Sequence, residues 1–347
     1  MEVTIVTFSY VLNRGAHMQC YALAKTIKQM GHKAKIVHIS LPKGHFSFKG
    51  KVFNYINNII YSLFRLKYYH NVTRKYVSSC ELIKNPPKSD IYIVGSDQVW
   101  NPALTKTFGS EAFFLDFVPK EKKKIAYAAS FGMSIWGKTD QDQRIKGLLH
   151  QFDAISVREL DGIDICKKTF NINNVVSVLD PVFLIEDYNN LIGKKRKIKD
   201  QVMCYPLCIN QETDFIFKET IKDLGLKGIS FNKHISGANI KIRNFSSIIN
   251  WLKCIAQSKF VITNSFHCMA FCIIFKKQFI ITPPFKGKES RITSLLDQLG
   301  LKERYIKSIE DFKDRKIELY QGINYDTVSE KLKCLRNFSL DFLKNNI

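Results

Sequence analysis

The segment KFVITNSFHCMAF, residues 259–271, brings residues suited to chemistry between two apolar runs. Five residues with the pattern of a buried strand precede Asn264, Ser265 and His267, and a helical apolar pattern follows them. Histidine is the commonest proton-transfer residue, and the positive end of a helix attracts anions. We therefore interpret His267 as a candidate general acid or base, and Asn264 and Ser265 as candidate substrate contacts; the alternative is a structural histidine.

A second polar group follows another apolar strand pattern, in VGSDQVWNP, residues 94–102. Ser96, Asp97 and Gln98 stand at the predicted carboxyl end of that strand, where they could contact a ligand, with Trp100 as a platform for a sugar ring. The alternative is a helix start in which Ser96 or Asp97 is the cap and Trp100 packs in the core.

Two further strand ends carry candidate anion contacts. Arg158 follows the strand pattern AISV, and its planar guanidinium suits a carboxylate or a phosphate; the alternative is a surface pair with Glu159 that contributes little. Asn13, Arg14 and Gly15 lie at a predicted strand-to-helix junction, where amides bind anions. The alternative there is a simple turn with Asn13 near the helix cap.

A second basic loop precedes a predicted helix in KGKESRITSLL. Lys286, Lys288 and Arg291 in this loop could close over a phosphate. By contrast, we interpret Asp180, which precedes a proline after another strand pattern, as a turn residue rather than a catalytic acid.

The elements that position these residues alternate between strand and helix. Residues 3–8, 16–32 and 33–39 read as strand, helix and strand, which starts a doubly wound sheet, and the alternation resumes after a basic stretch behind Gly193. The sequence predicts an α/β protein with two Rossmann-like domains facing a cleft. The predicted parts are an N-terminal domain (1–190), a basic linker (191–200), a C-terminal domain (201–325) and a final helix (326–347).

Residues 51–77 do not fit the alternation. They place five apolar residues on one helical face, surrounded by lysines, arginines and tyrosines. One interpretation is a helix that packs on the core and extends its lysines to water; the other is a helix that lies on an anionic membrane surface.

Composition narrows the class of protein. With 347 residues, 45% of them hydrophobic, and a net charge of +22, the chain has the composition of a globular protein that favours anionic partners. The nine cysteines lack paired CxxC spacing, so we expect free thiols and no metal site. The acidic second residue argues against a signal peptide, and we expect a cytoplasmic protein without a membrane-spanning segment.

Several segments together resemble the polysaccharide pyruvyl transferase family, in its order and spacing. They are NRGAHMQCYAL, DIYIVGSDQVWN, KIAYAASFG, ISVRE, VLDP, VITNSFH and SRITSLLDQLGL. The resemblance runs from about residue 3 to residue 301, and GSDQVWN and ITNSFH are its most specific parts.

The resemblance implies a glycosyltransferase-B-like arrangement and an enzyme of cell-surface polysaccharide synthesis. Such enzymes transfer the pyruvyl group of phosphoenolpyruvate to two sugar hydroxyls, which forms a pyruvate ketal without a metal or cofactor. It implies His267 as acid/base or phosphate ligand and Arg158 as a phosphoenolpyruvate contact. The sequence departs from the family pattern at Arg14, often Tyr, and at Cys268, commonly Gly.

Two rival functions remain open at this stage. One is a glycosyltransferase of the same fold that uses a nucleotide sugar; the comparable region TNSFHCMAFCIIF lacks the carboxylate-rich motif usual for ribose. The other is a nucleic-acid binder, against which the basic residues are spread rather than gathered in a reading module. We therefore expect no nucleic-acid partner. The resemblance implies phosphoenolpyruvate and a glycan as substrates, and the basic helix over 51–77 leads to the hypothesis that the acceptor is lipid-linked at the inner face of the membrane.

Overall fold

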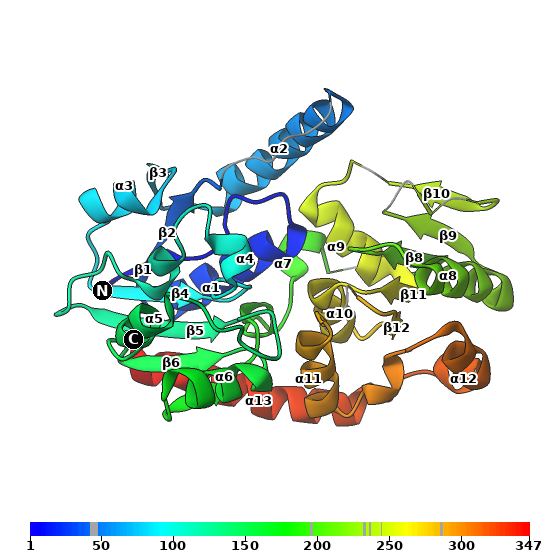
Figure 1. Cartoon of the computed structure of the whole chain (residues 1–347). Helices are drawn as coiled ribbons and strands as arrows, with labels where there is room; N and C mark the ends of the chain where they lie inside the picture. Colours follow the sequence, from blue (N-terminus) through cyan, green and yellow to red (C-terminus); the bar gives the residue numbers. More distant parts are fainter. Residues whose placement is uncertain (42–47, 195–196, 232–233, 236, 244, 285–286) are drawn as a thin grey trace. The chain divides into compact units, whose positions relative to one another are not determined.

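The chain forms two compact units, each built on its own parallel sheet. The computed structural model describes residues 1–41, 48–194, 197–231, 234–235, 237–243, 245–284 and 287–347. Unit 1 contains Met1–Ile185 and Cys334–Ile347, and unit 2 contains Glu186–Lys333 (Figure 1). Both units alternate strands with helices, so the predicted fold class of two Rossmann-like α/β domains is confirmed.

Unit 1 has a seven-stranded sheet in the order β3-β2-β1-β4-β5-β6-β7. Its strands are β1 (Glu2–Val6), β2 (Lys33–Ile39), β3 (Val72–Tyr76), β4 (Ile91–Gly95), β5 (Lys123–Ala129), β6 (Ala154–Val157) and β7 (Val175–Ser177). Its helices are α1 (Arg14–Gln29), α2 (Phe48–Tyr68), α3 (Ser79–Lys84), α4 (Pro102–Thr105), η1 (Ser110–Phe114), α5 (Asp142–Leu149), α6 (Leu160–Phe170), η2 (Pro181–Phe183) and the end of α13 (Tyr325–Asn346).

Different elements cover the two faces of this sheet. On one face, a side chain at Gly95 would collide with Leu23 of α1, and the ring of Tyr127 contacts Phe342 of α13. On the other face, one large apolar cluster joins strand residues such as Val6 and Val94 to the segment from Val99 to Val118 and to α5 and α6. All strands pair in parallel, so their carboxyl ends meet at one edge of the sheet.

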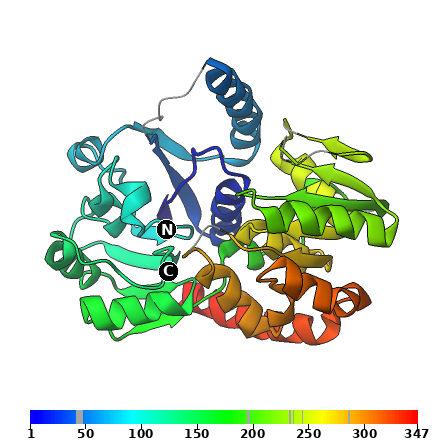
Figure 2. The ribbon, with the colours of Figure 1, turned by 45° about the vertical axis from the view of Figure 1, so that its right-hand side comes forward.

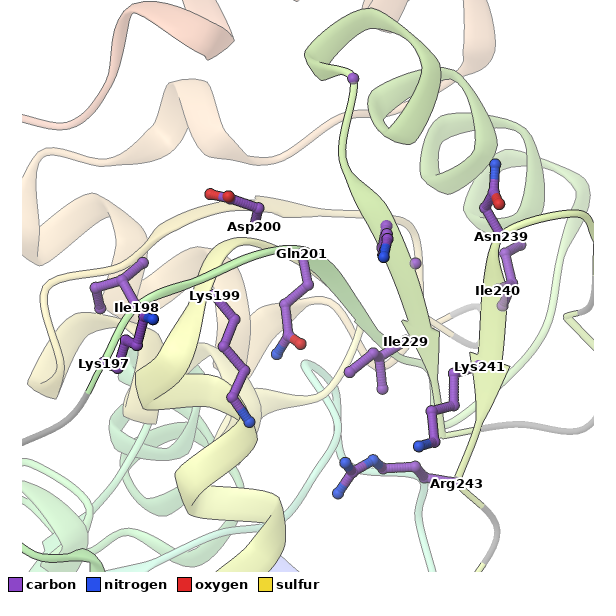
Figure 3. Close-up of a pocket in the computed structure, with 13 residues that line it drawn as sticks. Lys197, Ile198, Lys199, Asp200, Gln201, Ile229, Asn239, Ile240, Lys241 and Arg243 are labelled. Atoms are coloured by element: carbon purple, nitrogen blue, oxygen red, sulfur yellow. The ribbon is translucent and has the colours of Figure 1, made fainter.

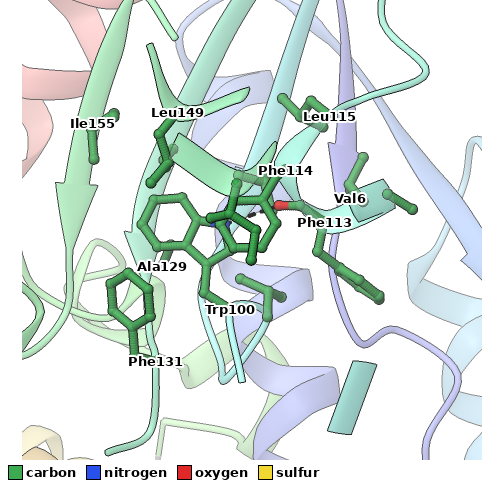
Figure 4. Close-up of a cluster of buried hydrophobic side chains, with 14 of the residues drawn as sticks. Val6, Trp100, Phe113, Phe114, Leu115, Ala129, Phe131, Leu149 and Ile155 are labelled. Carbon is green, nitrogen blue, oxygen red and sulfur yellow. Dashed lines mark hydrogen bonds between the residues drawn. The ribbon is translucent and has the colours of Figure 1, made fainter. Parts of the chain in front are cut away.

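Trp100 lies in the centre of that cluster, and the prediction that it serves as an exposed sugar platform is wrong. Its side chain is fully buried, and its ring stacks on Phe114 at 5.4 Å between centroids (Figure 4). The indole Nε1 donates a hydrogen bond of 3.0 Å to the Phe113 carbonyl. A tryptophan needs a partner for this polar group when it is buried, and η1 supplies one.

Unit 2 has a five-stranded sheet in the order β10-β9-β8-β11-β12. Its strands are β8 (Lys199–Tyr205), β9 (Lys227–Ser230), β10 (Ile240–Ile242), β11 (Ser258–Thr263) and β12 (Gln278–Ile281). Its helices are α7 (Asn189–Ile192), α8 (Gln211–Leu224), α9 (Ile248–Gln257), α10 (Phe266–Ile274), α11 (Ser290–Leu299), η3 (Lys302–Arg304), α12 (Ile309–Gln321) and the start of α13.

Helices cover both faces of the second sheet. Helices α8 and α12 cover one face of this sheet (Figure 2). Val202 and Cys204 of β8 lie on that face, where they join one apolar cluster with Phe217 and Phe312. The alternate residues point to α9 and α10, and the ring of Tyr205 contacts Trp251 of α9 at 5.3 Å. This alternation within one strand is expected because successive side chains point to opposite faces.

The structure departs from the predicted local elements at two places. The predicted helix over 51–77 ends at Tyr68, and Val72–Tyr76 pairs with β2 as an edge strand instead. Short β10 was not predicted, because three residues carry too little pattern to be recognised. The structure describes no helix long and apolar enough to cross a membrane.

The basic linker predicted at 191–200 is also shorter than expected. Leu191 and Ile192 are buried in α7, which contacts α9, and Lys199 is already paired with Ser258 in β8. Residues 195 and 196 lie outside the described residues. Unit 2 therefore includes most of this stretch, and α13 starts in unit 2 and ends in unit 1 rather than standing alone.

The buried position of Trp100 leads to a stability prediction. Trp100→Ala should lower the free energy of unfolding by about 3–5 kcal/mol, because it leaves a cavity among packed rings. Chemical denaturation followed by circular dichroism measures the loss. Ile135→Ala is the matched control, since Ile135 is 83% exposed and should change stability by less than about 0.5 kcal/mol. Equal losses in the two variants would contradict the packing described.

Candidate functional site

His267 lies in the first turn of α10, at the carboxyl edge of the second sheet. β11 ends at Thr263, and the Ser265 hydroxyl caps the helix by accepting a hydrogen bond from the Cys268 amide. The helix begins at Phe266, so His267 lies inside the helix rather than before it. Its side chain is buried against the ring of Phe266, and the residue is 7% exposed. The cap thus fixes the imidazole beside the positive end of α10.

Asn264 ties together the ends of three neighbouring strands. Its Oδ1 accepts a hydrogen bond of 2.7 Å from the Leu207 amide, and its Nδ2 donates to the Cys208 carbonyl at 2.8 Å. A longer bond of 3.5 Å reaches the Pro283 carbonyl. These partners follow β8 and β12, which flank β11. Asn264 therefore holds the turn that carries His267, and its predicted contact with substrate stays a prediction.

The second basic loop follows β12 and lies at the same edge of the sheet as His267. Arg291 is the second residue of α11, and Lys288 precedes that helix by two residues. Burial, followed by the positive charge of Arg291, lowers the pKa of Lys288. Two cations that oppose each other in this way favour an anion between or beside them. Lys286, the third residue predicted here, lies outside the described residues.

Arg158 is part of a buried ion pair at the carboxyl edge of the first sheet. Its Nη1 lies 2.9 Å from Asp180 Oδ2, and its Nε lies 3.7 Å from Glu159 Oε2. Burial would lower the pKa of Arg158, but the carboxylates of Asp180, Glu159 and Asp97 together raise it. The alternative of a surface Arg–Glu pair is wrong, because these side chains are at most 2% exposed.

Asp180 and Ser130 extend this cluster to the other strand ends. The Ser96 hydroxyl after β4 donates to Asp180 Oδ2 at 2.7 Å, so Ser96 acts within the fold as a support for Asp180. Asp180 Oδ1 accepts from the Val182 amide, as a turn residue would. The Ser130 hydroxyl after β5 donates to Glu159 Oε1 at 2.6 Å.

The sequence predicts the turn at Asp180, but its pattern does not indicate the contact between Asp180 and Arg158. Two features could have indicated this contact. Polar residues follow several strands whose ends meet at one edge of the sheet, and a buried arginine needs a carboxylate partner.

Asp97 and Gln98 form a tight turn after β4. Asp97 is 9% exposed and has a left-handed backbone with φ of 67°, which Asp tolerates better than most residues. Its Oδ1 accepts from the Gln98 amide. Gln98 packs against Gly132, where an added Cβ would lie 2.1 Å from Gln98 Oε1. Strained turns of this kind are often found at ligand sites, and a ligand role for both residues stays a prediction.

The first loop behaves as the alternative interpretation expects. Asn13 caps α1 by accepting a hydrogen bond of 3.2 Å from the Ala16 amide. Arg14 is half-buried, and its guanidinium lies 5.9 Å from the centre of the Tyr61 ring of α2. Gly15 is buried inside the first turn of α1. The cap is confirmed, whereas anion binding by these three residues stays a prediction.

His17 lies two residues after Gly15, and the sequence pattern did not indicate a role for it. Its Nε2 donates a hydrogen bond of 2.9 Å to the Val11 carbonyl, and its Nδ1 lies 3.0 Å from the Tyr69 hydroxyl. Burial, followed by the charge of Arg65, lowers the pKa of His17 to about 3. His17 is therefore a neutral residue that links the first loop to the segment directly after α2. In the sequence, its position just after the Asn13 cap was the one indication of this role.

The donor set for a metal is lacking in the described parts of both units. No group of three or more His, Cys, Asp or Glu side chains in these parts is arranged to hold a metal ion.

The chain is similar in fold to solved structures that hold UDP or a UDP-sugar. UGT89C1 of Arabidopsis thaliana, with UDP-L-rhamnose, has a TM-score of 0.54 at 9% identity, over 99% of this chain and 98% of that one. The UDP-bound MnaA of S. aureus gives 0.55 at 12% identity, over 95% and 90%. UDP-GlcNAc 2-epimerase of Methanocaldococcus jannaschii gives 0.51 at 12% identity, over 96% and 99%.

These likenesses define the fold class: the protein has the glycosyltransferase-B fold. Its sequence is more specific. The family model for polysaccharide pyruvyl transferases matches residues 13–283, and the chain belongs to that family. Among curated proteins, none gives a significant match. The resemblance found in the sequence is thus confirmed, across both units.

The low pKa of His17 predicts how stability depends on pH. The unfolded chain takes up a proton on this histidine below about pH 6.5, whereas the folded chain keeps it neutral down to about pH 3. The free energy of unfolding should therefore fall with decreasing pH across this window, by up to about 1.4 kcal/mol per pH unit from His17. Denaturation at several pH values measures the slope. His17→Gln should flatten it, and an unchanged slope in that variant would contradict the assignment.

Proposed function

We propose that this protein transfers the pyruvyl group of phosphoenolpyruvate to a sugar of a cell-surface polysaccharide precursor and forms a pyruvate ketal. The observation that carries the proposal is the family match over residues 13–283. Three further features support it. The cations of the second basic loop, the helix end beside His267 and the net charge of +22 suit a small donor that carries a carboxylate and a phosphate.

The reaction requires one proton delivered to carbon and one phosphate released. One sugar hydroxyl adds to the central carbon of phosphoenolpyruvate, and the methylene carbon takes up a proton to become a methyl group. The second hydroxyl then replaces the phosphate on the same carbon, and its proton leaves with the phosphate or the solvent. The products are the ketal and inorganic phosphate, so the enzyme needs an acid near the methylene and cations near the phosphate.

We assign the proton transfer to His267. Its imidazole is held by the capped start of α10 and by the turn that Asn264 fixes, so its position is set by the fold. Lys288 and Arg291 follow the neighbouring strand at the same edge, where they are suited to the phosphate. A group fixed in this way transfers a proton without first having to be ordered.

Arg158 has a different place in the proposal. Its guanidinium is engaged by Asp180 and Glu159, and this supports a positioning role at the carboxyl edge of the first sheet. The predicted contact of Arg158 with phosphoenolpyruvate stays a prediction. A positioning role predicts that Arg158→Lys weakens the hold on Asp180, because an ammonium lacks the planar fork.

Acceptor-dependent release of phosphate from phosphoenolpyruvate tests the proposal. We expect release only when the wild-type protein is given phosphoenolpyruvate with a lipid-linked or soluble glycan extract, and mass spectrometry should find the ketal on the glycan. His267→Gln should lower the rate by about 10²–10⁴-fold, as expected for loss of a general acid. His150→Gln is the control, because His150 is exposed in unit 1.

Each alternative result has a clear meaning. Full activity in a folded His267→Gln variant, checked by circular dichroism, would overturn the role of His267. Release of a nucleoside diphosphate from a nucleotide sugar, without use of phosphoenolpyruvate, would favour the glycosyltransferase that the fold also accommodates.

We further infer that α2 rests on an anionic membrane surface, where a lipid-linked acceptor would be found. The helix has two apolar faces. One contains Tyr61 and Phe64, which pack on His17 of α1. The other face is exposed to solvent and is called here the outer stripe: Val52, Tyr55, Ile59, Leu63 and Leu66.

The spacing and the nearby charges of the outer stripe favour a membrane. Successive members are three or four residues apart, so they share one side of the helix, and Leu63 and Leu66 are 63% and 79% exposed. Exposed Lys67, Arg74 and Lys75 follow the stripe in the chain. Each cation near an anionic surface contributes about 1 kcal/mol, and apolar side chains of an interfacial helix insert at the headgroup level.

Vesicle flotation tests this contact. The wild-type protein should float with vesicles rich in phosphatidylglycerol and remain unbound with phosphatidylcholine alone. The double variant Leu63→Glu with Leu66→Glu should lose most of the binding, since it places charge on the inserted face. Ile317→Glu, which changes an equally exposed isoleucine of α12, should bind as the wild type does. Binding that ignores lipid charge, or that survives the double variant, would contradict the inference.

A further inference from the structure

A cavity of about 780 Å³ lies on unit 2 away from the residues assigned above. It is bounded by β8, β9 and β10, and it reaches Lys199 and Gln201 in the first half of β8 (Figure 3). A smaller adjoining hollow of about 190 Å³ shares Lys199, Gln201 and Arg243 with it and reaches Lys253 of α9. His267 and the described residues of the loop before α11 line neither space.

The register of the strands places several of the lining residues on one face of the sheet. Gln201 pairs with Lys227, and Ile229 pairs with Lys241, so these residues share a face. Gln201 Nε2 donates to Ser258 Oγ at 2.9 Å and contacts Cys254, which identifies the face as that of α9. A side chain at Gly228 would instead meet Phe217 and Ile221 of α8 on the opposite face.

Most of the charged residues that line the two spaces are basic. The basic residues around the two connected spaces are Lys197, Lys199, Lys227, Lys241, Arg243 and Lys253. Among the residues that the structure describes, Asp200 is the one carboxylate in the lining, and it is already paired with Lys259 at 2.7 Å. In Figure 3 the side chains of Lys199, Lys241 and Arg243 lie on the same side of the strands, with their nitrogens toward the space between them.

Arg243 has donor capacity that the described parts of the chain do not use. Its Nε is buried and has no hydrogen-bond partner there. Arg243 lines the smaller hollow together with Lys253 and Cys254 of α9. A buried guanidinium donor without an acceptor is costly, and an anion in the cavity would satisfy it.

We propose that this cavity is a binding site for a diphosphate group, separate from the residues assigned to pyruvyl transfer. Neighbouring strands are about 4.8 Å apart, so cations on β8, β9 and β10 span about 10 Å before their side chains extend. A single phosphate is too small to contact all three strands at once, whereas two linked phosphates with their bridging oxygen can. The lysines supply mobile point charges, and Arg243 supplies a planar fork.

The size of the cavity argues for a small ligand rather than a polymer. Its volume lies within the range of about 300–1,000 Å³ usual for small-molecule sites. A nucleic acid would be expected to follow a longer basic groove with aromatic stacking platforms, and among the described lining residues none is aromatic.

Titration with inorganic pyrophosphate tests the site. At a constant ionic strength of about 0.15 M, which screens diffuse attraction beyond about 8 Å, calorimetry should give one saturable site per chain. Arg243→Gln and Lys199→Gln should each weaken binding by roughly tenfold or more, since each removes a charged hydrogen-bond donor. Arg243→Lys should fall between Arg243→Gln and the wild type, because it keeps the charge and loses the fork.

Lys333→Gln is the matched control. It removes the same charge from an exposed position of unit 2 that does not line the cavity, and it should leave the affinity unchanged within twofold. Binding that weakens equally in all variants would mean general attraction to a basic protein, and would overturn the site. Absence of saturable binding, or an unaffected folded Arg243→Gln variant, would overturn it as well.

Two further arms separate the sources of a diphosphate. A nucleoside diphosphate and a short polyprenyl diphosphate should each compete with pyrophosphate, and the tighter competitor identifies the source. A single-stranded oligonucleotide that competes better than both would overturn the assignment in favour of a polyanion surface. These titrations need neither phosphoenolpyruvate nor a sugar acceptor, so their outcome is independent of the proposed reaction.

Discussion

The buried ion pair between Arg158 and Asp180 is the interaction on which the carboxyl edge of the first sheet depends. Parallel strands bring their ends together at one edge, and the loops that leave this edge carry polar groups that burial would otherwise leave unsatisfied. Asp180 Oδ2 accepts hydrogen bonds from Arg158 Nη1, which follows β6, and from the Ser96 hydroxyl, which follows β4. The two distances are 2.9 and 2.7 Å. Removing one partner would leave a buried charge, which costs about 3–5 kcal/mol in comparable pairs.

The second sheet meets the same constraint with a neutral residue. Asn264 reaches the loops after β8 and β12 through its side-chain amide, and it needs no counter-charge to do so. The central residue at the edge that carries His267 is therefore the neutral Asn264. The corresponding edge of unit 1 instead contains the carboxylates of Asp180 and Glu159. An anionic donor is repelled less by the former arrangement, which supports the assignment of the phosphate contacts to unit 2.

The alternation of strands and helices could be predicted because it rests on local patterns. Segments such as Lys33–Ile39 and Ser258–Thr263 have apolar runs of strand length bounded by polar turns, and the structure forms strands there. The candidate residues at strand ends followed from the same patterns. Edge strand β3 was hidden because its residues continue the basic, aromatic composition of the preceding helix.

What a side chain contacts could not be read from these patterns. Trp100 and Arg158 were both taken as candidate ligand contacts, yet one is buried among rings and the other against carboxylates. Their partners, Phe113 and Asp180, are 13 and 22 residues away, so the pairing depends on tertiary structure. The cationic cavity is hidden for the same reason, because Lys199, Lys227 and Lys241 come from three different strands.

The path of the chain through the two units also bears on how the protein folds during synthesis. Unit 2 is a continuous stretch, Glu186–Lys333, whereas unit 1 is completed by the later residues Cys334–Ile347. In that last segment Ser339 binds the Leu179 amide and Leu343 is fully buried. During synthesis, all residues of unit 2 are therefore made before the last segment of unit 1. Until that segment is made, the face of the unit 1 sheet that the end of α13 covers is partly exposed to solvent. The protein is most prone to aggregation during this interval.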